Sequence, residues 1–408
     1  MRYTVGGMAR FGLDHAEQEY VDHVRRLAQD ELAGVPHLEG RVNRPLVQAL
    51  GRLGLLRGLF GGAPGEPPRD AAATQLCLLR ETLAAVRSDA ETALALQGLG
   101  SYPILQSGRP ETVARWLPGV VSGEVVAAFA LSEPEAGSDA AALSLRAEPD
   151  PSRGSGQAAG WRLYGEKTWI SNAPDADVYT VFARTTPGAR ARGVTAFAVA
   201  GDAEGLSGEP IDLLAPHPIG RLVFDGVRVT RGDVLGEVDD GFMVAMRTLD
   251  LFRPSVGAFA VGMAQAALDA AVEWSTRREV HGAPLHAQQS VSHTLAEMAT
   301  RVQASRLLVR AAAAAYDEGS PPHEVTKTAA MAKLFATESA QYVVDRAVQL
   351  HGARALQRGH LLEHLYREVR APRIYEGASE VQRSIIGRSL VREHEGRTAQ
   401  EQERLSRA

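Results

Sequence analysis

The stretch Phe129-Ala130-Leu131-Ser132-Glu133-Pro134-Glu135-Ala136-Gly137-Ser138-Asp139 decides how the fold of this chain is assigned. It begins as a short apolar run that is ended by hydroxyl, Pro and Gly residues, a pattern that predicts a strand followed by a turn. The pattern before it is helical, and the pattern after it changes to short apolar runs. The stretch therefore marks the start of a β region inside a largely helical protein.

The N-terminal region has a helical pattern from Asp14 onward. Apolar residues such as Val21 and Val24 recur at three- and four-residue spacing, which predicts amphipathic helices. Asp14 and Glu17 resemble a capping box, in which each side chain bonds the backbone of the other. Residues 61–68 are rich in Gly and Pro and predict a loop between helices.

Beyond the opening stretch, the chain changes period twice. Short apolar runs such as 178–183 and 194–200 alternate with turn residues and predict strands, with a loop at 149–160. After residue 236 the chain is Ala-rich and helical again. We therefore expect an N-terminal α-helical domain (10–124), a middle β domain (125–233), a C-terminal α-helical bundle (234–392) and a polar tail that frays (393–408).

Composition narrows the classes of function. The chain of 408 residues is 45% hydrophobic with a net charge of −5, and it carries no long basic run that would track a nucleic acid. Cys77, the one cysteine, has apolar neighbours, so we expect a buried thiol, no disulfide and a reducing cytoplasm. We expect no membrane span, because we find no run of about 20 apolar residues, and no N-terminal targeting segment.

Two further segments complete the pattern: Gly165-Glu166-Lys167-Thr168-Trp169-Ile170-Ser171-Asn172 and Arg373-Ile374-Tyr375-Glu376-Gly377-Ala378-Ser379-Glu380-Val381-Gln382-Arg383. The three segments, in this order, resemble the acyl-CoA dehydrogenase family, and the resemblance spans about residues 10–392. It implies an α+β fold with an all-α N-terminal domain, a middle β-barrel or sandwich and a C-terminal four-helix bundle. The implied activity is FAD-dependent α,β-dehydrogenation of an acyl-CoA to the trans-2-enoyl-CoA, in fatty acid or amino acid catabolism.

The resemblance also implies the cofactor site. Phe129, Leu131 and Ser132 would lie against the isoalloxazine ring of FAD, with Trp169 and Ser171 closing one side. A flavin that accepts a hydride needs such a flat apolar wall and a few hydrogen-bond donors. Further cofactor contacts implied by the resemblance are Arg278 at the pyrophosphate, Gln288, Gln289, Gln349 and Gly352 at the adenine end, and Ala378 and Glu380.

In this family the adenine end is held by a neighbouring subunit, which implies a homo-oligomer, either a dimer or a dimer of dimers (homotetramer). Two residues depart from the family pattern. His281 stands where an aromatic residue is usual, and Ala353 stands where a second glycine is usual. These departures bear on the geometry of the adenine site.

Glu376 is the implied catalytic base, which removes the α-proton of the thioester while the β-hydride passes to flavin N5. Apolar surroundings make a carboxylate a better base, and donors to the thioester oxygen stabilise the developing enolate. In the family these donors are a flavin ribityl hydroxyl and the N–H of the glutamate, and the electrons go on to an electron-transferring flavoprotein. The implied substrate contacts are Ser138, Asp250, Arg253, Tyr375 and Gly377, and the small residues of 96–100 would leave room in the pocket floor.

Other readings of the sequence stay open. An acyl-CoA oxidase or another flavoenzyme of the same fold would keep much of the pattern, and so would a non-catalytic flavin-binding scaffold. His360-Leu361-Leu362-Glu363-His364 has the spacing of an inverted zinc-peptidase helix and would imply a metal-dependent hydrolase. We favour a polar helix face there and expect no metal, because few residues remain downstream for a third ligand. The acyl chain of the substrate is not determined by the sequence.

Overall fold

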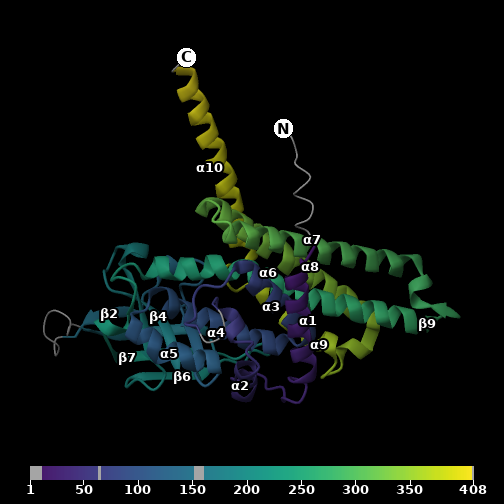
Figure 1. Ribbon diagram of the computed structural model, residues 1–408, viewed down its shortest axis with the longest axis horizontal. Helices are drawn as coiled ribbons and strands as arrows, with labels where there is room; N and C mark the ends of the chain where they lie inside the picture. Colours follow the sequence, from purple (N-terminus) through teal and green to yellow (C-terminus); the bar gives the residue numbers. More distant parts are fainter. Residues whose placement is uncertain (1–11, 63–65, 151–159, 407–408) are drawn as a thin grey trace. The chain divides into compact units, whose positions relative to one another are not determined.

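The structure is a computed structural model that describes residues 12–62, 66–150 and 160–406. In chain order, a helical N-terminal part, a sheet and a helical C-terminal part follow one another, which confirms the predicted fold class (Figure 1). The chain forms two compact units, one made of residues 12–252 and the other containing the described residues from 253 onward. The three-domain division of the sequence stays a prediction.

The first unit begins with helices that are packed on one another. The capping box at the start of α1 is confirmed, because Glu17 N donates to Asp14 Oδ1 at 2.8 Å and Asp14 N donates to Glu17 Oε2 at 3.0 Å. Cys77 is buried, as predicted. The helices are α1 (His15–Asp30), α2 (Arg44–Arg52), α3 (Ala73–Val86), α4 (Ser88–Ser107) and α5 (Pro110–Ser122).

One mixed sheet follows these helices. Its strands are β1 (Ala127–Ala130), β2 (Arg146–Pro149), β3 (Gly160–Ser171), β4 (Val178–Arg184), β5 (Val194–Ala200), β6 (Leu206–Pro210), β7 (Ile219–Thr230) and β8 (Val234–Leu235). The order across the sheet is β6-β7-β3-β2-β4-β5-β8, and β1 pairs in parallel with β4. The long strands β3 and β7 are antiparallel, with register shifts at Leu163/Tyr164 and Lys167/Ile170.

Helix α4 is fastened directly to β1. The buried Gln97 amide donates to Val125 O and accepts from Ala127 N, both at 2.7 Å. Glycines permit this approach: a Cβ at Gly100 would lie 2.5 Å from Ala128 N, and one at Gly98 would lie 2.8 Å from a ring carbon of Phe252. The small residues of 96–100, which the sequence suggested would leave room for a substrate, are in fact used here for close packing.

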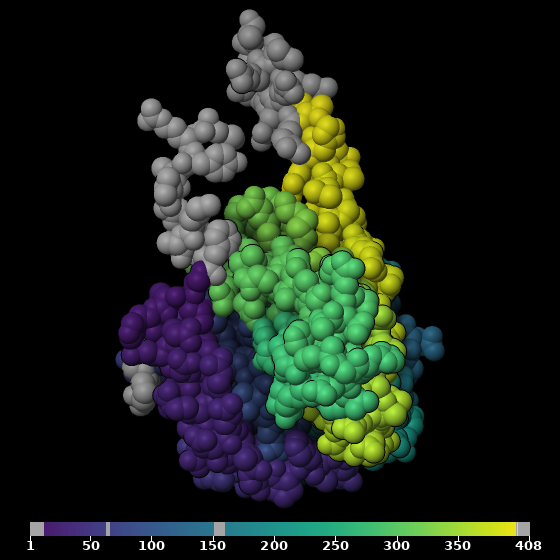
Figure 2. Space-filling view, turned by 90° about the vertical axis from the view of Figure 1, so that its right-hand side faces the viewer, coloured from purple at the N-terminus to yellow at the C-terminus, as the bar shows by residue number. Residues whose placement is uncertain are grey.

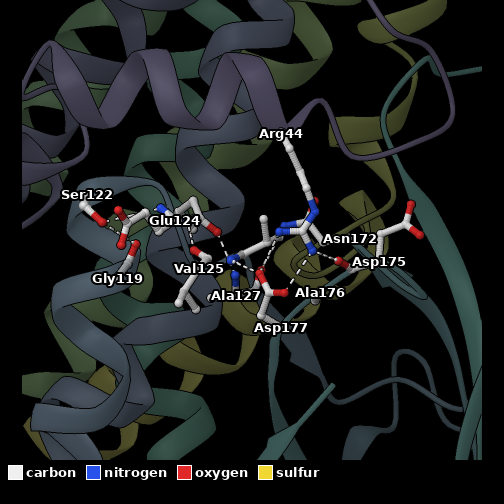
Figure 3. Close-up of polar contacts among 12 residues, drawn as sticks. Arg44, Gly119, Ser122, Glu124, Val125, Ala127, Asn172, Asp175, Ala176 and Asp177 are labelled. Atoms are coloured by element: carbon white, nitrogen blue, oxygen red, sulfur yellow. Dashed lines mark hydrogen bonds and ion pairs between the residues drawn. The ribbon is translucent and has the colours of Figure 1, made fainter. Parts of the chain in front are cut away.

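Ion pairs join the start of α2 to the turn between β3 and β4 (Figure 3). The Arg44 guanidinium donates to both carboxylate oxygens of Asp177, at 2.8 and 2.9 Å, and to Asp175 O at 2.7 Å. Asp177 Oδ2 also accepts Val126 N at 2.7 Å, and Arg41 pairs with the Asp175 carboxylate at 2.6 and 2.7 Å. A cleft of about 880 Å³ is lined by Arg41, Arg44, Asp175 and Asp177, among others. Their bidentate pairs fix the geometry of this contact.

The second unit is helical. Its elements are the C-terminal part of α6 (Gly241–Arg277), the hairpin of β9 (Glu279–Val280) and β10 (Ala283–Pro284), and the helices α7 (Gln289–Asp317), α8 (Pro322–His351), α9 (Leu361–Glu368) and α10 (Ser379–Ser406). Helix α8 packs against α7, α9 and α10. Helix α10, yellow in Figure 2, projects from the green helices α7 and α8.

Helix α10 differs from the expected fraying tail, because it continues without a break to Ser406. Glu, Gln and Arg dominate its second half, and these residues have high helix propensity. Helix α6 bears on the expectation that no segment is apolar enough to span a membrane. By length and composition it could cross a membrane, but 72% of its most apolar window is buried inside the protein, as in a core helix.

The contact between Gly100 and β1 gives the first prediction. Gly100→Ala is expected to destabilise the protein by about 1–3 kcal/mol, because the added methyl meets backbone atoms that cannot move aside cheaply. The matched control is Gly387→Ala in α10, where an added Cβ meets nothing within 4 Å, so helix propensity should raise stability by up to about 1 kcal/mol. Urea unfolding of both variants measures the difference. Equal stabilities for the two variants would contradict the packing described here.

Candidate functional site

The ends of β1 and β3 come together at a distorted point of the sheet. Thr168 N donates to Ser132 O at 3.1 Å, and the pairing of β3 with β7 is interrupted between Lys167 and Ile170. At this interruption Trp169 has a φ of 59°, in the left-handed region, and its side chain is 53% exposed. A bulky residue in that region is strained, and such strain is concentrated at functional sites.

The structure brings together the five residues predicted to contact the isoalloxazine ring. Phe129 lies on β1 with its ring 4.9 Å from that of Phe182, and Leu131 and Ser132 come directly after the strand. Ser171 is half-buried at the end of β3, just past the exposed Trp169 ring. An exposed indole and two half-buried hydroxyls on these adjoining segments are the kinds of group that a flavin ring needs, because it binds to apolar surface and a few polar groups.

Glu376 lies in an irregular loop before α10. Its φ is 50° and that of Gly377 is 98°, so two successive residues adopt left-handed conformations. The Gly377 carbonyl accepts hydrogen bonds from Lys333 Nζ at 2.7 Å and from Gln382 Nε2 at 2.9 Å. Glycine suits position 377 because a φ of 98° strains any residue with a side chain, and an added Cβ would lie 2.3 Å from Gln382 Nε2 and displace that amide. The backbone that carries the Glu376 carboxylate is therefore held firmly.

Lys333 joins two of the predicted site residues. Burial lowers the pKa of its ammonium from the usual 10.5 to about 8; the Glu376 carboxylate opposes this shift, and Arg253 adds to it. Arg253, a predicted substrate contact on α6, and Glu376, the predicted base, thus both lie close enough to act on one buried lysine. Sequence reasoning missed Lys333 and Gln382. The available signal was a lone lysine in the apolar run 329–334.

Glu338 braces the same loop from α8. Its carboxylate accepts Ser379 Oγ at 2.6 Å and pairs with Arg373 at 2.8 Å, so it contacts residues on both sides of Glu376. Burial raises the pKa of Glu338, but the bonds from Ser379 and Arg373 outweigh burial and hold the pKa below its usual value. Glu338 is therefore ionised at neutral pH.

The residues predicted for the pyrophosphate and the adenine end of FAD lie at or near the ends of helices. Arg278 follows α6 directly, Gln288 and Gln289 begin α7, and Gln349 and Gly352 lie at the end of α8, all exposed. Trp274, near the end of α6, contacts the end of α8. Its indole stacks on His351 with ring centroids 5.2 Å apart and donates to Leu350 O at 3.0 Å.

His281, a departure from the family pattern, has a local structural explanation. It forms the turn of the β9–β10 hairpin with Gly282, and both residues have positive φ, 54° and 80°. A two-residue hairpin of this kind requires left-handed residues at both positions. Histidine is among the non-glycine residues that adopt this conformation most readily.

The remaining predicted contacts are placed as follows. Ser138 is exposed in the turn after β1, next to Asp139, which pairs with Arg190 at 3.0 Å. Asp250 and Arg253 lie three residues apart on α6, half-buried and buried respectively. Flanking Glu376, Tyr375 and Ala378 are half-buried, whereas Glu380 is exposed in the first turn of α10.

The His360–His364 segment has structural roles in this fold. His360 is the N-cap of α9, where its Nδ1 accepts Leu362 N at 3.1 Å, and Glu363 pairs with Arg367 at 2.7 Å. Across the described ranges, no group of three or more His, Cys, Asp or Glu side chains is placed to hold a metal ion. The geometry therefore gives no support to a hydrolase.

Comparison with known proteins identifies the family. The models of the acyl-CoA dehydrogenase N-terminal, middle and C-terminal domains match residues 14–124, 128–227 and 239–391. Cyclohexane-1-carbonyl-CoA dehydrogenase of Geobacter metallireducens is 33% identical over 91% of this chain and 96% of its own length.

Solved structures agree with this assignment. Butyryl-CoA dehydrogenase of Megasphaera elsdenii matches with a TM-score of 0.85 and 31% identity, over 93% of this chain and 99% of that one. PigA, solved with FAD and proline, matches with a TM-score of 0.84 and 25% identity, over 93% of this chain and 98% of that one. The chain thus belongs to the acyl-CoA dehydrogenase family and is an FAD-dependent oxidoreductase that acts on the CH–CH bond of an acyl-CoA.

Proposed function

We propose that Glu376 is the base that removes the α-proton of the acyl-CoA thioester. The observation that carries this proposal is the backbone of Glu376, which is strained, irregular and fixed by bonds from Lys333 and Gln382 to the next carbonyl. A base must be held within reach of its proton, because misplacement by about 1 Å can lower a rate a hundredfold. A surface glutamate would need none of these supports.

Each group of this site has a role in the proposed reaction. Bound FAD supplies the acceptor for the hydride that leaves the β carbon. Phe129, Leu131, Ser132, Trp169 and Ser171 hold the flavin ring, and Glu376 takes the proton from the α carbon. The N–H of Glu376 donates to the thioester oxygen as enolate charge develops. Ser138, Asp250, Arg253, Tyr375 and Gly377 bind the substrate, and Arg278, Gln288, Gln289, Gln349, Gly352, Ala378 and Glu380 bind the rest of FAD.

Glu376→Gln tests the base. Glutamine keeps the size of the side chain but cannot take a proton at neutral pH, so FAD and acyl-CoA should still bind while flavin reduction slows by about 10²- to 10⁴-fold. Anaerobic stopped-flow bleaching of the visible flavin band measures the rate. The matched control is Glu395→Gln, an exposed glutamate of α10, which should leave the rate unchanged. Normal reduction in Glu376→Gln would sink the assignment.

The substrate class follows from the same measurement. The named relatives act on an alicyclic and on a short acyl-CoA, so a panel should contain straight short, medium, branched, alicyclic and aromatic thioesters. The class that bleaches the flavin fastest at low concentration identifies the physiological acyl group.

We propose an electron-transferring flavoprotein as the acceptor and the cytoplasm as the location. Rapid reoxidation by oxygen in place of that protein would indicate an acyl-CoA oxidase.

The pKa of Lys333 gives a prediction about stability and pH. Between about pH 8 and 10.5 the folded protein binds fewer protons at Lys333 than the unfolded chain does. The titration of Lys333 therefore makes the free energy of unfolding increase with pH over this range. Compared with Lys333→Met, the wild type should gain about 1–3 kcal/mol over this range. Urea unfolding at several pH values measures the difference between the two proteins. A constant difference would show that Lys333 titrates normally.

We propose that the protein is a homo-oligomer, either a dimer or a dimer of dimers. Exposed apolar side chains in the second unit favour self-association, because such groups are stabilised by burial against another surface. Sedimentation velocity of the FAD-loaded protein should show a dimer or tetramer. An FAD-loaded monomer at micromolar concentration would contradict the proposal. The exposed side chains are Phe335, Ile374, Leu390 and Val391.

A further inference from the structure

Lys167 and Glu133 form a buried ion pair that the reaction itself does not use. Lys167 Nζ lies 2.8 Å from Glu133 Oε1, and the two side chains are 0% and 3% exposed. Taking two charges out of water is unfavourable, and apolar residues of similar volume often stabilise a fold as well. A function beyond stability therefore needs to be considered for this pair.

Both residues of the pair also form hydrogen bonds to nearby backbone groups. Besides its bond to Glu133, Lys167 Nζ donates to Leu131 O at 2.9 Å. The Glu133 carboxylate accepts Ser144 N at 2.6 Å, Ser144 Oγ at 2.8 Å and Leu145 N at 2.9 Å. Charge-assisted bonds of this kind are stronger than neutral ones and fix geometry. The pair therefore fixes Leu131 to the 144–145 segment and to β3.

Both residues are ionised at neutral pH. Although burial raises the pKa of Glu133, the Lys167 ammonium and the N–H groups of Leu145 and Ser144 hold it below the usual value. Burial lowers the pKa of Lys167 to about 8, Glu133 opposes the shift, and the Arg184 guanidinium adds to it. Arg184 donates to Leu143 O at 3.0 Å and to Ala141 O at 2.9 Å, so it supports the same segment as Glu133.

The two segments that the pair joins are those assigned to the flavin. Leu131 and Ser132 come directly after β1. Lys167 lies on β3, two residues before Trp169, where the pairing of β3 with β7 is interrupted. The strained φ of Trp169 persists only if the surrounding structure imposes it. Two bonds provide that restraint on the two residues that precede Trp169. Lys167 Nζ donates to Leu131 O, and Thr168 N donates to Ser132 O.

We propose that Lys167 and Glu133 are positioning residues for FAD: their buried ion pair sets the Leu131–Ser132 backbone and the Trp169 ring at the spacing that the isoalloxazine ring requires. This inference rests on the flavin contacts assigned under the proposed function. Neither residue touches the cofactor in this scheme. Their effect on FAD passes through the two segments that they join.

The test uses the holoenzyme and the double variant Glu133→Gln/Lys167→Met, which removes both charges together. A neutral pair avoids leaving one buried charge alone, so the protein should fold with a melting temperature close to that of the wild type. The bond from Lys167 to Leu131 O is nevertheless lost. We expect FAD to dissociate at least tenfold faster and the visible circular dichroism of the bound flavin to change.

A matched control separates positioning from stability. Arg80 and Glu91 form another buried ion pair of the first unit, between α3 and α4, two helices that carry none of the predicted flavin contacts. Glu91→Gln/Arg80→Met should change the melting temperature by a comparable amount without changing the FAD dissociation rate or the circular dichroism. Lys167→Met alone should weaken the binding of FAD further than the double variant does, because it leaves the Glu133 charge buried without its cation.

The variant Trp169→Ala distinguishes an error in the positioning role from an error in the assignment of the flavin contacts. If Trp169→Ala speeds FAD dissociation and Glu133→Gln/Lys167→Met does not, the positioning role is wrong and the flavin assignment stands. If neither variant changes FAD, the flavin contacts themselves are wrongly assigned. If the Arg80/Glu91 control changes the flavin as much as the Lys167/Glu133 variant, the effect is one of general stability and the proposal is overturned.

Discussion

The short strand β1 must satisfy buried backbone groups that no neighbouring strand reaches. A buried N–H or C=O group without a partner is strongly unfavourable, so nearly all such groups in native proteins are paired. Here side chains act as the partners: Ala127 N donates to Gln97, and Ala127 O accepts Asn172 Nδ2 at 2.8 Å. Directly after the strand, Leu131 O accepts Lys167 Nζ. The placement of α4 and of the end of β3 both follow from this requirement.

In the second unit too, side chains bond backbone carbonyls that regular secondary structure leaves unpaired. The loop that carries Glu376 is irregular, so its carbonyls have no helical partners, and Gly377 O accepts a buried lysine and a buried glutamine instead. In each unit, therefore, a buried ammonium holds a carbonyl next to residues assigned to the chemistry. Lysine suits this task because its three donors can bond a carbonyl and a carboxylate together.

The sequence predicts the order of elements because periodicity and turn residues are local signals. The change of period near Val125, the capping box at Asp14 and the buried Cys77 all needed only neighbouring residues. The predicted flavin residues came from motifs, and the structure brings Phe129 and Trp169 to adjoining strand ends.

What sequence reasoning missed depends on contacts between distant segments. A lysine in an apolar run, such as Lys167 or Lys333, shows no partner in its own sequence, since Glu133 and Gly377 lie 34 and 44 residues away. The glycines at 98 and 100 were taken as space for a ligand because the sequence does not show which backbone approaches them. Helix α10 was expected to fray because burial was weighed there and helix propensity was not.

Trp169 also shows a trade-off between the stability of the fold and its function. Glycine would adopt the left-handed backbone at this position without strain, and a more regular β3 would not need that conformation at all. The fold nevertheless keeps a large aromatic residue there, half in solvent, where it contributes little to the core. Selection for stability alone would remove this residue. Under the proposed assignment, the flavin gives this ring a partner that the chain by itself does not supply, so Trp169 serves binding at a cost in stability.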